Sequence, residues 1–282
     1  MYCTVGALRL RRWKDEGKGT LASKFEYDEK ESKRTERGNL APEVVRPRMH
    51  TVDVLGPRVG ECIIDVGCGP GLLVHDLAVQ VGPEGRVVGL DSSLPMLQLA
   101  EHRCAELPQV EFLEGDATSL AADDATFDAV ACMQVLLYIA DIDKVLEELY
   151  RVLKPGGRVA IMETDWRGAV INSTDSALTE KMVAAWDHKV ANPNLPVRLG
   201  PLLRRHGFCA VRVEAIPILS TSYVADGWSV GMLDQTDGTT TANWRVIGGT
   251  GDYAMLHGNG KLVGTPIVLG ASILDLYTGQ LH

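Results

Sequence analysis

The residues best suited to bind a ligand stand together in one segment, 61–71, which reads ECIIDVGCGPG. Apolar, β-prone residues surround Asp65, and a turn containing Gly67, Gly69 and Gly71 follows. Glycine lets a backbone approach a ligand closely and adopt positive φ. The next ten residues, LLVHDLAVQV, have apolar side chains at helical spacing, and a helix start offers unpaired N–H groups. A strand, a glycine turn and a helix in this order predict a site for a nucleotide-type ligand.

The spacing of the glycines excludes two other nucleotide-binding turns. A dinucleotide fingerprint has the pattern G-x-G-x-x-G, but Leu72 occupies the position of its third glycine. A P-loop needs a Lys-Ser or Lys-Thr pair, and none follows this turn. The pattern G-x-G-x-G after an acidic residue resembles motif I of the class I S-adenosylmethionine (SAM) dependent methyltransferases. A structural turn in an unrelated α/β domain is the alternative.

Two further acids follow predicted strands in the order that this resemblance implies. The segment 86–91, RVVGLD, predicts a second strand, and Asp91 lies about 20 residues after the glycine turn, where a carboxylate can accept hydrogen bonds from both ribose hydroxyls. A surface acid is the alternative at this position. The segment 109–116, QVEFLEGD, predicts a third strand. There the resemblance implies that Asp116 accepts a hydrogen bond from the adenine amino group and that Ala117 supplies a backbone N–H.

The resemblance implies SAM as cofactor and S-adenosylhomocysteine as product. In the family the residue at the position of Met96 often lies against the adenine ring, although here Met96 can equally pack into the core. Ser92 or Ser93 is expected to cap the helix that contains Met96. The residues expected to bind the cofactor are Asp65, Gly67, Cys68, Gly69, Gly71, Asp91, Ser92, Met96, Gly115, Asp116, Ala117 and Gln134.

The segment 60–165 predicts an α/β fold. FDAVACM, 127–133, reads as a fourth strand buried on both faces, and LKPGGRVAIME, 153–163, as a turn followed by a fifth strand. With the glycine turn and the two acidic strand ends, these signals resemble the class I family in order and spacing. We therefore expect a Rossmann-like, doubly wound, mostly parallel seven-stranded sheet with helices on both faces. Residues 165–231 resemble small-molecule methyltransferases of the ubiquinone-biosynthesis and arsenite-methyltransferase type more loosely.

Candidate catalytic and substrate-binding residues follow the ends of the fourth and fifth strands, because ligands of open α/β sheets bind there. Methyl transfer needs a general base only if the nucleophile must lose a proton. Trp166 can form an apolar pocket wall or be an ordinary aromatic residue of the loop. Tyr27 can face the substrate or fix its helix to the body. The expected catalytic residues are Asp165, Tyr138 and His188, and the expected substrate-binding residues are Tyr27, Tyr138 and Trp166.

The chain is expected to have four regions. Residues 1–23 form a loosely attached N-terminus, 24–58 a helical cap, 59–231 the SAM-binding domain and 232–282 an atypical β-rich tail. Helices are expected within 24–37 and near 44–55 of the cap, and over 141–153 and 174–192 of the domain. The tail is similar to a fragment of the small barrels of allene-oxide cyclases and dirigent proteins, but it is too short for the roughly eight strands of such a barrel. It can instead supply a seventh strand through PIVLGASIL, or pair with another subunit. A homodimer through the cap or the tail is therefore a possible assembly.

Charge and composition narrow the partners. The net charge is −9, and residues 1–50 hold 12 Lys and Arg against 8 Asp and Glu. The acidic remainder argues against a nucleic-acid substrate. No apolar run reaches the roughly 18 residues of a membrane span. Six scattered cysteines indicate a reduced, cytoplasmic protein, and neither a C-x-x-C pair nor a carboxylate cluster predicts a metal site.

The sequence thus predicts a SAM-dependent methyltransferase that acts on an O, N or C atom of a small, largely apolar metabolite. The alternative is a SAM-binding scaffold or cyclase of secondary metabolism that transfers no methyl group. The β-rich tail motivates that alternative. An assembly element is a third role for the tail.

Overall fold

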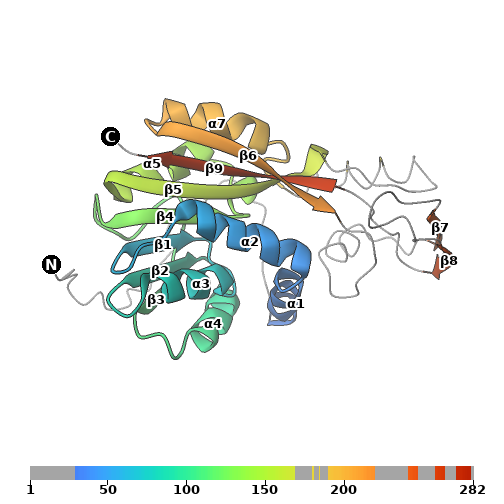
Figure 1. Cartoon of the computed structure of the whole chain (residues 1–282), viewed down its shortest axis with the longest axis horizontal. Helices are drawn as coiled ribbons and strands as arrows, with labels where there is room; N and C mark the ends of the chain where they lie inside the picture. Colours follow the sequence, from blue (N-terminus) through green and yellow to red (C-terminus); the bar gives the residue numbers. More distant parts are fainter. Residues whose placement is uncertain are drawn as a thin grey trace, which may run out of the picture.

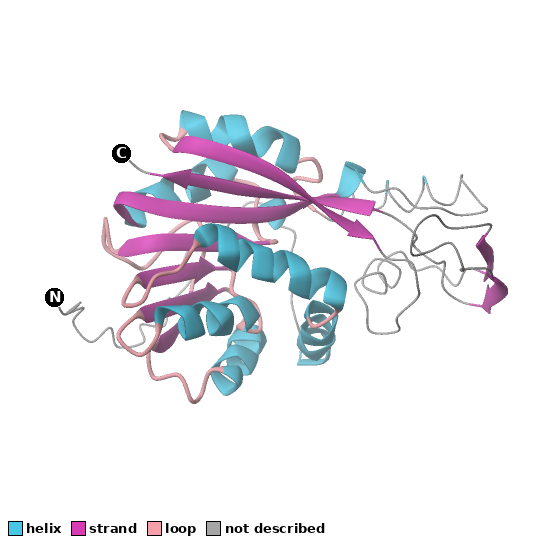
Figure 2. Ribbon diagram, in the orientation of Figure 1, coloured by secondary structure: helices cyan, strands magenta, loops and turns pink. Residues whose placement is uncertain are grey.

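A computed structural model describes residues 29–168, 180, 184, 190–219, 241–246, 258–263 and 271–280. Its main sheet has the strand order β3-β2-β1-β4-β5-β9-β6 (Figures 1 and 2). The strands are β1 (Cys62–Val66), β2 (Arg86–Asp91), β3 (Val110–Glu114), β4 (Phe127–Met133), β5 (Leu153–Asp165), β6 (Cys209–Leu219) and β9 (Ala271–Gln280). The first five strands pair in parallel, and β9 is antiparallel to both of its neighbours. The expected α/β class with a mostly parallel sheet is confirmed.

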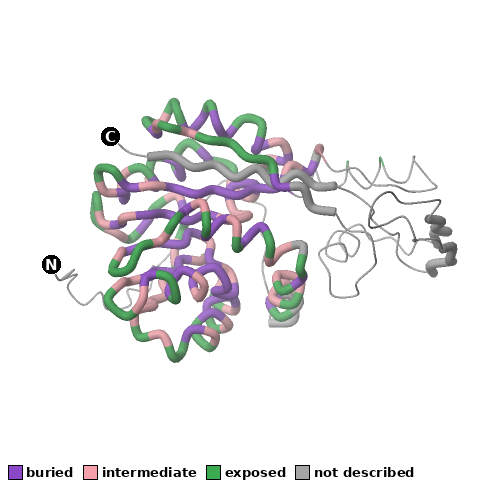
Figure 3. The backbone as a smooth tube through the Cα atoms, in the orientation of Figure 1, coloured by how far each residue is buried: buried purple, intermediate pink, exposed green. Residues whose placement is uncertain are grey.

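Helices cover both faces of this sheet (Figure 1). They are α1 (Glu29–Asn39), α2 (Pro42–Leu55), α3 (Leu72–Val81), α4 (Leu94–Arg103), α5 (Ile142–Val152) and α7 (Pro196–Arg205), with short 3-10 helices η1 (Leu136–Tyr138) and η2 (Trp166–Gly168). Because successive strand residues point to opposite faces, Ile63 packs in a core with α2, α3 and α4, whereas Ile64 packs in a core with α5 and α7. Figure 3 shows the buried residues concentrated along these strands.

The topology fixes where a ligand can bind. The chain order reverses between β1 and β4, since β2 and β3 lie on one side of β1 and β4 and β5 on the other. In open α/β sheets the ligand crevice lies beyond the carboxyl ends of the strands at such a reversal. The segments that follow β1, β2, β4 and β5 therefore border the candidate site.

The cap segment contains two helices, each slightly displaced from its expected bounds. The helix expected within 24–37 runs over 29–39 among the described residues, and the next begins at Pro42 rather than near Val44. Proline suits the first helical turn because its missing N–H has no intrahelical partner there. Gly56 ends α2 in the left-handed conformation, with φ +59°. No helix in the described portion of the chain is both long and apolar enough to cross a membrane.

The C-terminal tail contributes to the main sheet through β9. This strand lies between β5 and β6, and its register runs from Arg158 opposite Gln280 to Asp165 opposite Ile273. The strand begins later than PIVLGASIL suggested, because only the last four residues of that segment belong to it. The other two described strands of the tail, β7 (Thr241–Val246) and β8 (Gly258–Val263), form a separate antiparallel pair.

The expected division of the chain into the regions 1–23, 24–58, 59–231 and 232–282 stays a prediction. The N-terminal residues 1–23, Tyr27, His188 and most of the helix expected over 174–192 lie outside the described residues. The homodimer also stays a prediction. Since β9 is a strand of the main sheet, however, the tail is not wholly separate from the domain expected over 59–231.

Candidate functional site

The glycine turn after β1 is fastened to the end of β2. The backbone N–H groups of Gly67 and Cys68 donate to the Leu90 carbonyl at 2.7 and 2.9 Å. The Gly69 N–H donates to Oδ2 of Asp91 at 2.8 Å. Gly71, with φ +74°, then caps the start of α3. The turn therefore has a fixed shape, and Asp91 contributes to it directly.

The three glycines of this turn are required for different reasons. A Cβ atom on Gly67 would lie 2.2 Å from Cγ2 of Val135, and one on Gly71 would lie 2.7 Å from Cβ of Ala100. A Cβ atom on Gly69 would meet nothing within 4 Å, although its φ of +52° is also left-handed. Packing within the protein thus explains the first and last glycine. At Gly69 the space beside the backbone is open, which suits a ligand.

Asp65 lies behind the turn as a buried acid. It is 2% exposed, and its Oδ1 has no hydrogen-bond partner. Burial, and secondarily the charge of Asp91, raise the pKa of Asp65 to about 8. A buried carboxyl oxygen without a partner is unfavourable unless a donor can reach it. A ligand that donates a hydrogen bond to this oxygen would remove that penalty.

Asp91 and Asp116 are brought close by the pairing of β2 and β3. The N–H of Gly115 donates to the Asp91 carbonyl at 3.0 Å. Oδ1 of Asp91 also accepts from the Ser93 N–H at 2.8 Å, and burial raises its pKa although these N–H groups oppose the shift. Asp116 is exposed, and its Oδ1 accepts both the N–H and the hydroxyl of Thr118 at 2.8 Å. Each carboxylate keeps lone pairs for a further donor.

The other predicted cofactor residues differ in accessibility. Ser92 is exposed, whereas Met96 is 3% and Ala117 8% exposed. Cys68 is also buried, and burial raises the pKa of its thiol. Ser93, rather than Ser92, caps α4, since its side chain accepts from the Met96 N–H. The burial of Met96 fits either a core role or contact with a ligand, so its role stays a prediction.

Gln134 follows β4 in an unusual conformation. Its φ is +59°, which a non-glycine residue rarely adopts, and its N–H donates to the Met162 carbonyl at 2.8 Å. Its side-chain oxygen accepts from the Thr164 hydroxyl at 2.7 Å, while the buried amide nitrogen has no partner. The backbone strain and the unpaired donor both occur beside the expected position of the transferred group, as is common at functional sites.

Glu163 is a buried acid that sequence reasoning did not identify. Its Oε1 accepts from the N–H groups of Val135 and Leu136 at 3.0 and 2.7 Å, and Oε2 has no partner. Burial raises its pKa to about 8, although the N–H donors oppose the shift. Glu163 thus fixes the loop whose Val135 packs against Gly67. The available signal was an acid within an otherwise apolar strand, 159–163, VAIME.

The catalytic and substrate candidates are only partly placed. Tyr138 ends η1 after β4, Asp165 ends β5, and Trp166, 6% exposed, begins η2. Because β4 and β5 are adjacent and parallel, these three residues follow the same edge of the sheet. Tyr27 and His188 lie outside the described residues. Among the residues that the structure describes, no group of three or more His, Cys, Asp or Glu is placed to hold a metal ion.

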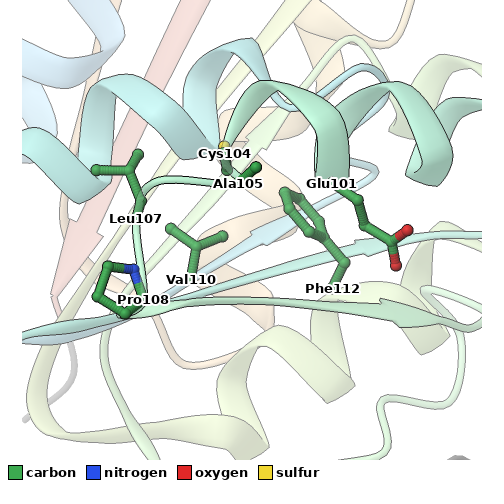
Figure 4. A pocket seen from close by; sticks show the side chains of 7 residues that line it. All are labelled: Glu101, Cys104, Ala105, Leu107, Pro108, Val110 and Phe112. Atoms are coloured by element: carbon green, nitrogen blue, oxygen red, sulfur yellow. The ribbon is translucent and has the colours of Figure 1, made fainter.

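A separate hollow of about 300 Å³ lies between the end of α4 and β3 (Figure 4). It is lined by Glu101, Cys104, Ala105, Leu107, Pro108, Val110 and Phe112. Most of these residues precede β3 or begin it, so the hollow lies toward the amino end of that strand. None of the residues described above lines it, and it is therefore not the candidate site.

Comparison with known proteins identifies the class. Residues 64–161 match the family model described as methyltransferase domain, and this segment is a methyltransferase domain of the class I SAM-dependent type. An uncharacterized 37.1 kDa protein in transposon TN4556 of Streptomyces fradiae is 34% identical over 194 residues, which cover 68% of this chain and 56% of that protein. A demethylmenaquinone methyltransferase of Lactococcus lactis is 41% identical over 119 residues, 42% of this chain and 47% of the relative. The chain thus spans about half the length of the curated relatives that it matches.

Solved structures show the same fold at low sequence identity. Phosphoethanolamine N-methyltransferase 2 of Haemonchus contortus, in complex with SAM, has a TM-score of 0.62 at 18% identity and covers 92% of this chain and 58% of its own. The [4+2]-cyclase SpnF has a TM-score of 0.54 at 21% identity, with 84% of this chain and 81% of its own covered. At such identity the likeness concerns the fold alone, which methyltransferases share with at least one cyclase.

Proposed function

We propose that this chain binds SAM and transfers its methyl group to an O, N or C atom of a small, largely apolar metabolite. The observation that carries the proposal is the buried, unpartnered oxygen of Asp65 behind a glycine turn that is open at Gly69. A cofactor with an ammonium group at its amino-acid end supplies the donor that this oxygen lacks. A match of residues 64–161 to methyltransferase domains supports the same cofactor.

The described residues fit the other moieties of SAM. Asp91 lies at the end of the neighbouring strand and can accept from ribose hydroxyls with the lone pairs that Gly69 and Ser93 leave free. Asp116 is exposed beside it and can accept from the adenine amino group. Asp65 is proposed to accept a hydrogen bond from the ammonium group at the amino-acid end of SAM. Asp65 is the next-to-last residue of β1, Asp91 ends β2 and Asp116 follows β3, so one ligand can cross all three acids.

When bound, the sulfonium of SAM supplies an activated methyl carbon. The residues after β4 and β5 must then hold an acceptor atom in line with that carbon and exclude water, and correct orientation can supply several kcal/mol of the barrier. Gln134, fixed by Thr164 and by its own backbone, offers an amide N–H toward such an acceptor. Asp165 and Tyr138 are the proposed bases for an acceptor that must lose a proton, and Trp166 the proposed apolar wall. The proposal also retains Tyr27 as a substrate residue and His188 as a catalytic one.

The relatives suggest which acceptors to test first. Two of the matching relatives are a demethylmenaquinone methyltransferase and a 2-phytyl-1,4-naphtoquinone methyltransferase, and both act, by name, on quinone rings. We infer that a quinone-type ring is a suitable first substrate class for this chain. The acceptor atom would then be a ring carbon or oxygen.

Calorimetry with SAM tests the cofactor, and mass spectrometry of S-adenosylhomocysteine formed with demethylated quinones tests the reaction. Replacing Asp91 with asparagine is expected to weaken SAM binding about tenfold or more, because hydrogen bonds to charged groups contribute roughly 1.5–3 kcal/mol. Replacing the exposed Glu84, in the turn before β2, with glutamine is the matched control and should change nothing. Absence of SAM binding to the wild-type chain would refute the proposal.

A cyclase without methyl transfer is the second candidate, since a fold like that of the cyclase SpnF is compatible with either activity. Both candidates require the cofactor site, so SAM binding does not distinguish them. Formation of S-adenosylhomocysteine with any metabolite would reject the cyclase version.

A further inference from the structure

Helix α1 docks on the body through polar contacts. Its sequence, EKESKRTERGN, contains no apolar side chain that could anchor it in a core. Glu36 of α1 instead forms an ion pair with the guanidinium of Arg103, at the end of α4. Both side chains are about three-quarters buried, so this pair is screened less than a fully exposed one.

Arg103 connects this ion pair to the glycine turn. Its Nε donates to the carbonyl of Pro70 at 3.0 Å, and Pro70 lies between Gly69 and Gly71. One guanidinium therefore holds a residue of α1 and the backbone of the turn at the same time.

A second arginine ties the other end of α1 to the helix that follows the turn. Nη1 of Arg48, on α2, donates to the Asn39 carbonyl at 3.0 Å, and its Nε pairs with Asp76 of α3 at 2.8 Å. Arg48 is 7% exposed. The position of α1 is thus coupled to both sides of the glycine turn, through Arg103 and through α3.

Ser32 is a second buried polar residue of α1. It is 1% exposed, and its hydroxyl has no hydrogen-bond partner. Residues four apart lie on the same helix face, so Ser32 and Glu36 both point toward the body. A buried hydroxyl without a partner is unfavourable, and a ligand group at this position removes that penalty.

We propose that α1 closes over the amino-acid end of the cofactor, that Ser32 donates a hydrogen bond to the carboxylate of that end, and that Arg103 is the positioning residue that couples α1 to the glycine turn. The inference rests on the proposed function, since it names further residues of the same site. Docking of α1 and binding of the cofactor then strengthen each other, and salt weakens both by screening the ion pair.

The test measures SAM affinity by calorimetry at about 20 and 300 mM salt. Glu36→Gln should weaken binding about two- to fivefold at low salt and reduce the salt dependence. Arg103→Lys keeps the charge but cannot hold Pro70 and Glu36 together. It should therefore weaken SAM binding, and reduce the salt dependence of binding, as much as Glu36→Gln does. The effects of the two substitutions should not multiply in the double variant, because both break one connection. Glu111→Gln, which breaks the partly exposed pair with Arg86 at the amino end of β2, is the matched control.

Ser32→Ala separates ligand binding from stability. Since its hydroxyl has no partner in the free chain, the variant should unfold at the same temperature as the wild type or slightly higher, yet bind SAM about fivefold more weakly. Wild-type affinity in Ser32→Ala or in Glu36→Gln would overturn the inference while leaving the proposed function intact. Failure of the wild type itself to bind SAM would instead remove the proposed function.

Discussion

Asp65 carries a proton in the free chain at neutral pH, because burial and then the charge of Asp91 raise its pKa to about 8. An ammonium group bound at its unpartnered oxygen favours the ionised carboxylate. Binding of SAM at pH 7 should therefore release up to about one proton. Calorimetric titrations in phosphate and in Tris, which differ in ionisation enthalpy, measure this number directly.

Two substitutions control for other titrating groups. Asp65→Asn removes the ionisation and should bind SAM without proton release. Glu163→Gln alters a second acid with a pKa of about 8, but alternation along β5 places that acid on the sheet face with α5 and α7, opposite to Asp65. Its proton release should match that of the wild type. Equal release by Asp65→Asn would show that another group titrates.

Glu163 should instead make the stability of the chain depend on pH. Its pKa in the folded state is raised above the ordinary value of 4.5, so the folded state binds more protons than the unfolded state between these values. The free energy of unfolding therefore falls as pH rises from about 5 through 8. Glu163→Gln keeps an oxygen for the N–H groups of Val135 and Leu136 and loses the charge. Urea unfolding measures this at pH 6 and pH 9. From pH 6 to pH 9, the free energy of unfolding of the variant should rise by about 1–2 kcal/mol relative to that of the wild type. If the difference in free energy of unfolding between the variant and the wild type is the same at both pH values, the prediction is wrong and the ionised Glu163 is in contact with water.

Individual site residues can be predicted from the sequence when local spacing along the chain determines their positions. The glycine turn and Asp91 are adjacent to strands that hydrophobic patterns reveal, so their positions follow from the chain. Glu163 was missed because its partners, the N–H groups of Val135 and Leu136, come from a different strand end. The pair of Glu36 and Arg103 joins residues that are 67 positions apart, and no local pattern predicts it.

In the glycine turn, a substitution at Gly69 can separate the effect of a glycine on protein stability from its effect on ligand binding. Gly69→Ala creates no clash within the protein, so only the left-handed backbone should destabilise the fold, by about 1–2 kcal/mol. The added methyl occupies the open side of the turn, and SAM affinity should fall at least about tenfold. Thermal unfolding and calorimetry measure the two effects.

Gly156→Ala is a matched control for backbone strain. Gly156 has φ +78° in the turn that begins β5, and its Cβ would likewise meet nothing within 4 Å. The variant should lose a similar amount of stability and keep the affinity for SAM. If both variants lose affinity equally, strain rather than contact with the cofactor determines binding at Gly69.

Elements with a repeating apolar pattern were predicted, and those held by distant contacts were not. Helix α5 follows the pattern DIDKVLEELYRVL, in which buried residues recur at three or four positions. The N-terminal boundary of α2 shifted to Pro42, since proline is favourable at a helix start. The bounds of β9 could not be predicted, because its position depends on pairing with β5 and β6 rather than on its own sequence.

For the whole molecule, β9 integrates the C-terminal tail into the fold. Truncation after Gly270 removes a strand that pairs on both sides, and it leaves β5 and β6 without their common neighbour. Because a domain is stable by only about 5–15 kcal/mol, the truncated chain should lose cooperative unfolding and SAM binding. The pair β7–β8 offers the control, since Thr241 lies opposite Val263 and a linker of about four residues can replace 241–263. This internal deletion should keep the unfolding midpoint and the affinity for SAM, as measured by circular dichroism and calorimetry. A truncated chain as stable as the wild type would show that β9 is dispensable, whereas loss of SAM binding in the deletion variant would assign β7–β8 to the site.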